Sequence, residues 1–151
     1  MKQSILNVFS SSIEEVLISL CNCDLSIDDP HTINVSETID DINIVLKISG
    51  DIKGEILYCM SDAFLLEVAS HMMELPVTNI DDLTLSASSE IGNIVTGKAI
   101  TKLADIGFNC DFTVPEVVIG KNMPIKLSNN SPTIISAFTS FGTISLLMAT
   151  K

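Results

Sequence analysis

The spacing of apolar residues changes between two periods along this sequence, and the order of these changes limits the folds that the chain can adopt. Apolar side chains recur every three or four residues over 3–20, which predicts an amphipathic helix. Isoleucine and leucine occupy every second position over 42–48, and after the turn residues Gly50-Asp51 a second apolar run follows over 54–60. This pattern predicts a β-hairpin. The chain therefore mixes helices and antiparallel strands.

The remaining segments predict two more helices and three more strands. Ser61 is suited to be the N-cap of a second helix that ends before Pro76. Asp81 or Asp82 is suited to cap a third helix that extends to about Asp105. Polar stretches predict loops at 21–30 and 121–132. The last apolar runs predict strands at 114–119, 133–139 and 143–149.

The resulting order is helix, strands, two helices and three strands. This order lacks the strict alternation of strand and helix that a doubly wound parallel sheet requires. We therefore predict an α+β fold in which the helices pack on one layer of β-sheet. The 151 residues are 46% hydrophobic, and no Gly/Ser-rich or Pro-rich linker divides them, so we expect a single domain over 1–151.

The charge of the chain excludes several classes of partner. Nineteen acidic residues and eight basic ones give a net charge of −11. Nucleic acids and anionic membrane surfaces are bound through clustered cations, so we expect neither as a partner. Glu14 and Glu15 interrupt the first apolar stretch, and serines and threonines interrupt the apolar region 133–150. We expect no transmembrane segment and a cytoplasmic protein.

Cysteine and histidine form no recognisable metal-binding motif in this sequence. No Cys-x-x-Cys pair is present, and we expect free thiols in a reducing cytoplasm. Cys21, Cys23 and His31 could supply three zinc ligands, but unpaired loop thiols are the favoured interpretation, and we expect no metal bound by this chain. His71 is expected on a partly exposed helix face. The four cysteines are Cys21, Cys23, Cys59 and Cys110.

The third predicted helix carries polar residues on one side and small or apolar residues on the other. At about 100° per residue, one face presents a serine, a carboxylate, an amide and a glycine. They are Ser86, Glu90, Asn93 and Gly97. The roughly opposite face presents Leu85, Gly92, Val95, Ala99 and Leu103. A glycine inside a helix costs about 0.8–1 kcal/mol relative to alanine, so the two glycines indicate close contacts with other surfaces. Glu90 and Asn93 are expected to point away from the core.

The segment around this pair carries a resemblance to a known family. It reads Glu90-Ile91-Gly92-Asn93-Ile94-Val95-Thr96-Gly97-Lys98-Ala99. It resembles the signature of the CheX/CheC/FliY phosphatases, which remove phosphate from the response regulator CheY in bacterial chemotaxis, and the order of predicted elements is also similar to this family. The resemblance implies that Asn93 orients the attacking water and that Glu90 contacts the regulator. Ser86 and Gly97 share the helix face of this pair, so we expect them to contact the partner together with Glu90.

The resemblance also implies partners and a cofactor. The partner is a phosphorylated CheY-like response regulator, and the Mg²⁺ that the reaction needs belongs to that receiver, so this chain binds no cofactor of its own. The first predicted helix has no second Glu-x-x-Asn motif, which makes the chain CheX-like, and CheX relatives are homodimers. We expect a homodimer for this reason, and because the strands would leave an exposed sheet edge in a monomer.

The chemistry of the pair is consistent with a phosphatase. An acyl phosphate is already activated, so a partner protein needs only to place a water in line with the phosphorus. The Asn93 amide can accept a hydrogen bond from that water and donate one to an oxygen. Two alternatives stay open. One is a non-catalytic module that binds a receiver or the flagellar switch through the same helix, and the other is a structural dimerisation domain with a chance motif.

Overall fold

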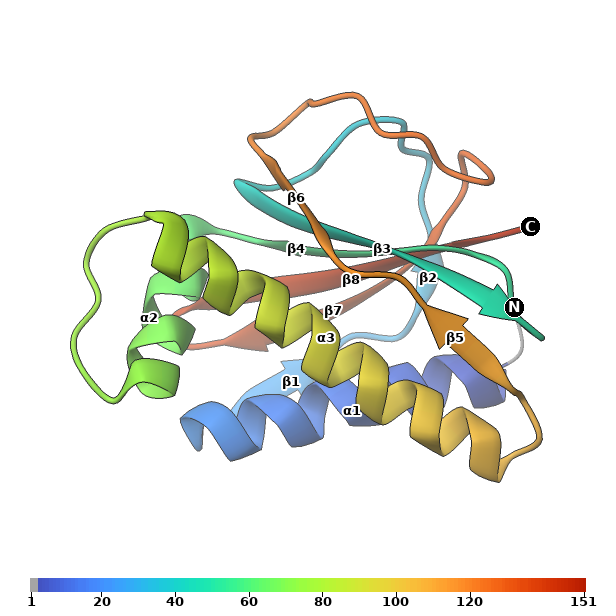
Figure 1. Cartoon of the computed structure of the whole chain (residues 1–151), viewed down its shortest axis with the longest axis horizontal. Coiled ribbons are helices and arrows are strands. Elements are labelled where there is room, and N and C mark those ends of the chain that lie inside the picture. The colour runs from blue at the N-terminus through green and yellow to red at the C-terminus, as the bar shows by residue number, and fades with distance from the viewer. Residues whose placement is uncertain (1–2) are drawn as a thin grey trace.

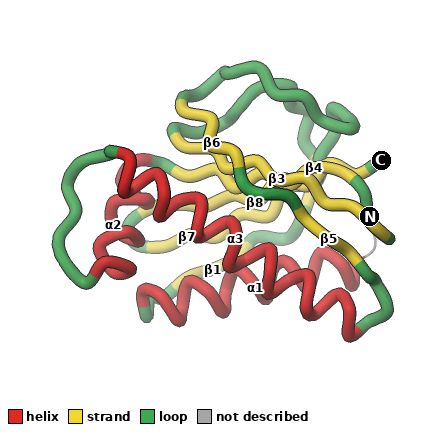
Figure 2. Tube along the Cα trace, viewed as in Figure 1, coloured by secondary structure: helices red, strands yellow, loops and turns green. Residues whose placement is uncertain are grey.

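Three helices cover one face of an antiparallel β-sheet, and two long loops cover the other face (Figures 1 and 2). The computed structural model describes residues 3–151. Within this range the helices are α1 (Gln3–Cys21), α2 (Asp62–Met73) and α3 (Asp82–Asp105). The strands are β1 (Leu25–Ile27), β2 (His31–Thr32), β3 (Ile42–Gly50), β4 (Gly54–Met60), β5 (Cys110–Phe112), β6 (Glu116–Ile119), β7 (Thr133–Thr139) and β8 (Gly142–Thr150).

The long strands lie at the centre of the sheet and the short strands at its edges. The strand order is β1-β7-β8-β4-β3-β5, with β2 also paired to β7 and β6 also paired to β3. In the central strand β4, Leu57 pairs with Val45 on one side and Leu147 on the other. The edge strands β1, β2, β5 and β6 contain two to four residues each. Such short edges protect a sheet against pairing with another chain.

This arrangement corrects one of the reasons for expecting a homodimer. The sequence predicts that β-branched strands leave an exposed sheet edge in a monomer. In the structure the long outer strands β3 and β7 are each covered by two short strands, so neither of them is the edge. The sheet edges are short strands and not the long β-branched ones, so the prediction of a homodimer rests on the family resemblance.

The main core lies between the helices and the sheet. Fully buried side chains of α1, α2 and β4 meet there, among them Phe9, Phe64 and Tyr58. A smaller cluster on the opposite face is formed by Leu57, Cys59, Ile134 and Leu147. Side chains of the two covering loops pack on it, including Ile33, Val35, Ile125 and Leu127. Because the sheet is covered on both faces, its central strands are apolar on both sides.

The helix α1 is long and apolar, and its apolar side chains are part of the core. By length and composition it is the one helix among residues 3–151 that could cross a membrane. Its apolar side chains nevertheless lie in the main core, including Phe9 and Ile13, which are fully buried. A core helix of a soluble protein passes the same test of length and composition. The burial of this stripe accounts for its hydrophobicity without a membrane.

The α+β fold and the order of its long elements are confirmed. The hairpin of β3 and β4 and all three helices lie where the sequence predicts them. Two predictions are wrong in detail: the loop at 21–30 contains β1, and the strand predicted at 114–119 begins at Glu116. The short strands β2 and β5 were not predicted. Strands of two or three residues are too short to show an alternating pattern, and their pairing partners define them.

Candidate functional site

The ends of α3 are fixed by local hydrogen bonds, which place the Glu-x-x-Asn motif in the middle of the helix. Asp81 is the N-cap, and its carboxylate accepts a hydrogen bond from the backbone N–H of Thr84 at 3.0 Å. The Thr84 hydroxyl accepts one from the Asp81 N–H at 2.7 Å, which completes a capping box. After the C-cap Ile106, Gly107 has a φ of 96°, a left-handed conformation that ends the helix. Glu90 and Asn93 therefore lie in regular helix.

The rotation of α3 about its axis is set by two contacts with the sheet. A Cβ built on Gly92 would lie 3.0 Å from the Cγ2 of Ile44, so this glycine allows the helix to approach β3 closely. On the same side, the Thr96 hydroxyl and the Tyr58 hydroxyl form a buried hydrogen bond of 2.8 Å. Burial raises the pKa of Tyr58, so its hydroxyl stays protonated. These contacts turn the opposite side of α3 outward.

We expect Tyr58→Phe to lower the free energy of unfolding by about 1–3 kcal/mol, because it leaves the buried Thr96 hydroxyl without this partner. Urea denaturation measures the change. Adding Thr96→Val to the same protein removes the unpaired hydroxyl and should recover part of the loss. A Tyr58→Phe protein as stable as the parent would show that the hydroxyl pair does not hold α3 on the sheet.

The outward side of α3 brings the four predicted site residues onto one face. Ser86 and Glu90 are exposed, whereas Asn93 and Gly97 are half-buried. Within residues 3–151, neither Glu90 nor Asn93 uses its side chain in a hydrogen bond or an ion pair. A carboxylate and an amide one turn apart are thus available to a second molecule. Such a pair can hold a cation with one group and orient a water with the other.

Open space lies beside this pair at Gly97. A Cβ built there would meet one described atom within 4 Å, the Cζ of Phe112 on β5, at 3.9 Å. This is an ordinary van der Waals distance, so packing within the chain does not require glycine at this position. Gly92 and Gly97 therefore differ. Gly92 allows α3 to contact the sheet, and the missing side chain of Gly97 leaves the outward face of α3 open to the approach of another molecule.

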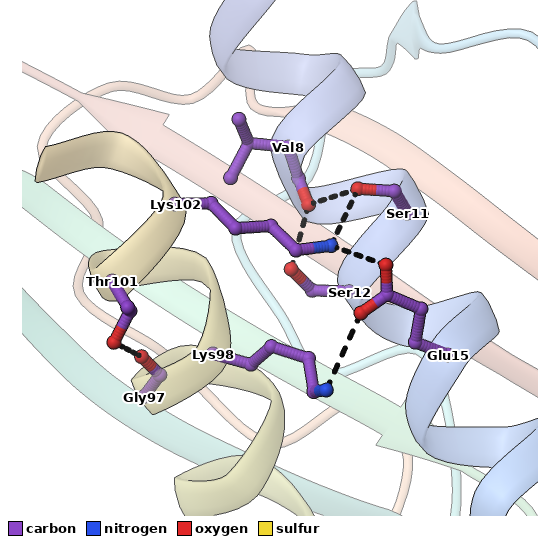
Figure 3. A network of polar contacts seen from close by, with 8 residues as sticks. All are labelled: Val8, Ser11, Ser12, Glu15, Gly97, Lys98, Thr101 and Lys102. Carbon is purple, nitrogen blue, oxygen red and sulfur yellow. Dashed lines mark hydrogen bonds and ion pairs between the residues drawn. The ribbon is translucent and has the colours of Figure 1, made fainter. Parts of the chain in front are cut away.

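Next to the motif, a carboxylate of α1 binds two ammonium groups of α3 (Figure 3). Glu15 lies 2.7 Å from the Lys102 Nζ and 3.3 Å from the Lys98 Nζ. Lys102 also donates a hydrogen bond to the Ser11 hydroxyl at 3.0 Å. Hydrogen bonds from Lys102 first, and from Lys98 second, hold the pKa of Glu15 below its usual value. Sequence patterns do not predict this network, because no local pattern connects residues more than 80 positions apart.

The cysteines and histidines lie apart from the motif. Among residues 3–151 no group of three or more histidine, cysteine, aspartate and glutamate side chains is placed to hold a metal ion, so Cys21, Cys23 and His31 do not form a ligand set. All four thiols are free. Burial raises the pKa of Cys21 to about 11 and that of Cys59 to about 12, so both are protonated at neutral pH. His71 is partly exposed on α2, as predicted, and lies 3.4 Å from Glu67.

Comparison with known proteins identifies the family. The family model described as chemotaxis phosphatase CheX matches residues 42–139, a range that contains the whole motif. A protein of Thermotoga maritima named CheY-P phosphatase CheX is 32% identical over 127 residues, which cover 83% of this chain and 82% of that protein. This level of identity over most of both chains reflects common descent.

Solved structures show the same fold. The chemotaxis protein CheX of Desulfovibrio desulfuricans has a TM-score of 0.87 at 19% identity, and the match covers 98% of this chain and 99% of that chain. A chain of the CheX–CheY–BeF3–Mg²⁺ complex from Borrelia burgdorferi has a TM-score of 0.81 at 22% identity, covering 97% of each chain. The model match, the sequence identity and the shared fold agree, and this chain belongs to the chemotaxis phosphatase CheX family.

Proposed function

We propose that this chain hydrolyses the aspartyl phosphate of a CheY-like response regulator receiver, with Asn93 orienting the attacking water. The observation that carries the proposal is the geometry of α3, where Glu90 and Asn93 stand one turn apart on the outward face and have no partner among residues 3–151. The family and the name of the Thermotoga maritima relative supply the class of reaction.

The hydrolysis needs little from the phosphatase beyond positioning. Water attacks the phosphorus, the bond between phosphorus and the aspartate oxygen breaks, and the products are inorganic phosphate and a free carboxylate. The carbonyl oxygen of Asn93 accepts a hydrogen bond from the water, and its NH₂ group donates one to a phosphoryl oxygen. Holding the water in line can supply several kcal/mol of barrier reduction. The Mg²⁺ that neutralises the phosphoryl charge is supplied by the receiver.

The proposal is tested by the lifetime of the aspartyl phosphate on a panel of CheY-like receivers. Each receiver is phosphorylated, the small-molecule phosphodonor is removed, and phosphate release is followed with and without this chain. We expect at least one receiver to lose its phosphate faster when the chain is present. Unchanged lifetimes across a panel that includes the receivers of the same organism would contradict the proposal.

Glu90 has the docking role in this proposal, since its carboxylate can pair with a lysine on the receiver. We expect Glu90→Ala to raise the Kd for the phosphorylated receiver by about two- to fivefold at low salt and less at high salt. Thermal stability should hardly change, because the side chain is exposed. Isothermal titration at two salt concentrations measures the effect.

Glu14→Ala is the matched control, because it removes an exposed glutamate from α1 and changes the net charge equally. It should leave the Kd close to that of the parent. If Glu90→Ala bound the receiver as tightly as the parent but lost all turnover, Glu90 would act on the water and the docking role would be wrong.

The proposal includes a homodimer in solution, supported by the resemblance to CheX. Light scattering should give a mass of about 33 kDa, twice the 16.3 kDa of the chain. A mass near 16 kDa at micromolar concentration would contradict it. A cytoplasmic location is also part of the proposal, and the four free thiols are consistent with a reducing compartment.

A further inference from the structure

Lys98 belongs to the motif segment but has no task in the proposed hydrolysis. It follows Glu90 by eight residues, which places it about 12 Å further along α3. Its side chain is 43% exposed and extends over the flank of α3 that faces α1 (Figure 3). Lys102 lies one turn later on the same flank and is 27% exposed. Both ammonium groups approach the same carboxylate, that of Glu15.

Lys102 has more hydrogen-bonding and ion-pair partners than Lys98. Lys102 has two partners, Glu15 at 2.7 Å and the Ser11 hydroxyl at 3.0 Å. Lys98 has one, Glu15 at 3.3 Å. An exposed ion pair contributes about 0–1 kcal/mol, so Lys98 can exchange Glu15 for another carboxylate at little cost. Glu15 then keeps Lys102 as its partner, and no charge is left without a counter-charge.

We propose that Lys98 is a second recognition residue for the phosphorylated receiver: on docking it leaves Glu15 and pairs with a carboxylate of the receiver. This inference rests on the proposed function. A receiver holds its Mg²⁺ through carboxylates, so the surface around its phosphorylation site is rich in acidic groups. This chain carries a net charge of −11, which repels an acidic surface, and a cation beside the motif reduces that repulsion.

Lys98 and Glu90 together define a direction along α3. One negative and one positive group, separated by about 12 Å along the axis of a rigid helix and by about 80° around it, match a receiver surface that carries the opposite charges in the same order. A receiver turned end for end would bring like charges together. The pair would thus fix which way the receiver lies over Asn93, and it would favour the orientation that presents the phosphoryl group to the amide.

The structure offers a matched control in Lys102. Lys98→Gln and Lys102→Gln each remove one positive charge and one ion pair with Glu15. We expect Lys98→Gln to raise the Kd for a CheY-like receiver activated with beryllofluoride and Mg²⁺ by about two- to fivefold at low salt, with a smaller effect at high salt. At receiver concentrations below the Kd, the rate of phosphate release should fall by a similar factor. Lys102→Gln should raise the Kd less, because it removes only the partner that Glu15 keeps when Lys98 leaves.

A third variant should change the Kd for the receiver in the opposite direction. Glu15→Gln removes the group that competes with the receiver for Lys98, so it should lower the Kd by up to about twofold. Glu14→Gln is its control, with the same change of net charge on the same helix. If Glu15 and Lys98 instead served only to join α1 to α3, Glu15→Gln would weaken binding and lower the melting temperature.

The inference is wrong if Lys98→Gln binds the activated receiver like the parent, or if both lysine variants weaken binding equally. Failure of the proposed function gives a different result, namely no acceleration of phosphate release by the parent chain. The binding comparison needs no turnover, so it decides the role of Lys98 even for a chain that binds receivers without hydrolysing them. A parent chain that binds no activated receiver would overturn both.

Discussion

Replacing Asn93 with alanine should slow receiver dephosphorylation by about 100-fold or more, which corresponds to about 2.7 kcal/mol of barrier. The Kd for the receiver and the melting temperature should stay close to those of the parent. Asn93 lies on the outward side of α3, away from the contacts of Gly92 and Thr96 with the sheet, so its truncation opens no core cavity. A solvated surface residue would not produce an effect of this size.

The comparison is made on one receiver, with single-turnover rates at saturating chain and with binding measured separately. Asn7→Ala is the matched control, since it makes the same chemical change at an exposed position of α1. It should retain the parental rate. If Asn93→Ala keeps more than about a third of the parental rate, Asn93 has no part in the mechanism and the motif is an ordinary solvated face.

Replacing Gly97 with alanine should change stability and activity in opposite directions. The added methyl group fits the free protein, because the nearest described atom, the Phe112 Cζ, is 3.9 Å away. Alanine is favoured over glycine in a helix by about 0.8–1 kcal/mol, so the free energy of unfolding should rise by a similar amount. The same methyl group lies one turn after Asn93, where the receiver must approach, and we expect dephosphorylation to fall by about tenfold or more.

Urea denaturation and phosphate release on the same preparation separate these two effects. Ser19→Ala, at an exposed position of α1, raises helix propensity without touching α3, and it should stabilise the protein modestly at full activity. If Gly97→Ala were stabilised and fully active, the receiver would not approach this part of α3, and Gly97 would have to be removed from the partner-binding face.

The long elements of the fold could be predicted because their patterns repeat several times. The alternation in β3 and the helical spacing in α1 each extend over several periods, and each pattern is therefore strong enough to predict its element. The edge strands β1, β2 and β5 carry too few residues for a period, and pairing with β7 and β3 creates them. Their positions depend on the assembled sheet, which local sequence does not describe.

Some features of the candidate site could likewise be predicted from the sequence, and others could not. Helical geometry was sufficient to place Glu90 and Asn93 on one exposed face, because both lie within a single capped helix. It could not separate the two glycines, since Gly92 and Gly97 carry the same local cost, and only the distance to Ile44 shows which one serves the core. The ion pairs of Glu15 with α3 depend on the packing of two helices distant in sequence, so only the structure revealed them.

We propose that this chain is a catalyst and more than a binding partner of a receiver. The direct test is the amount of phosphate released per chain when a phosphorylated CheY-like receiver is in large molar excess. We expect many phosphates to be released per chain, at a rate that is proportional to the concentration of the chain and lost in Asn93→Ala. Release that stops at one phosphate per chain, or a receiver that keeps its phosphate while bound, would show a non-catalytic receiver-binding module.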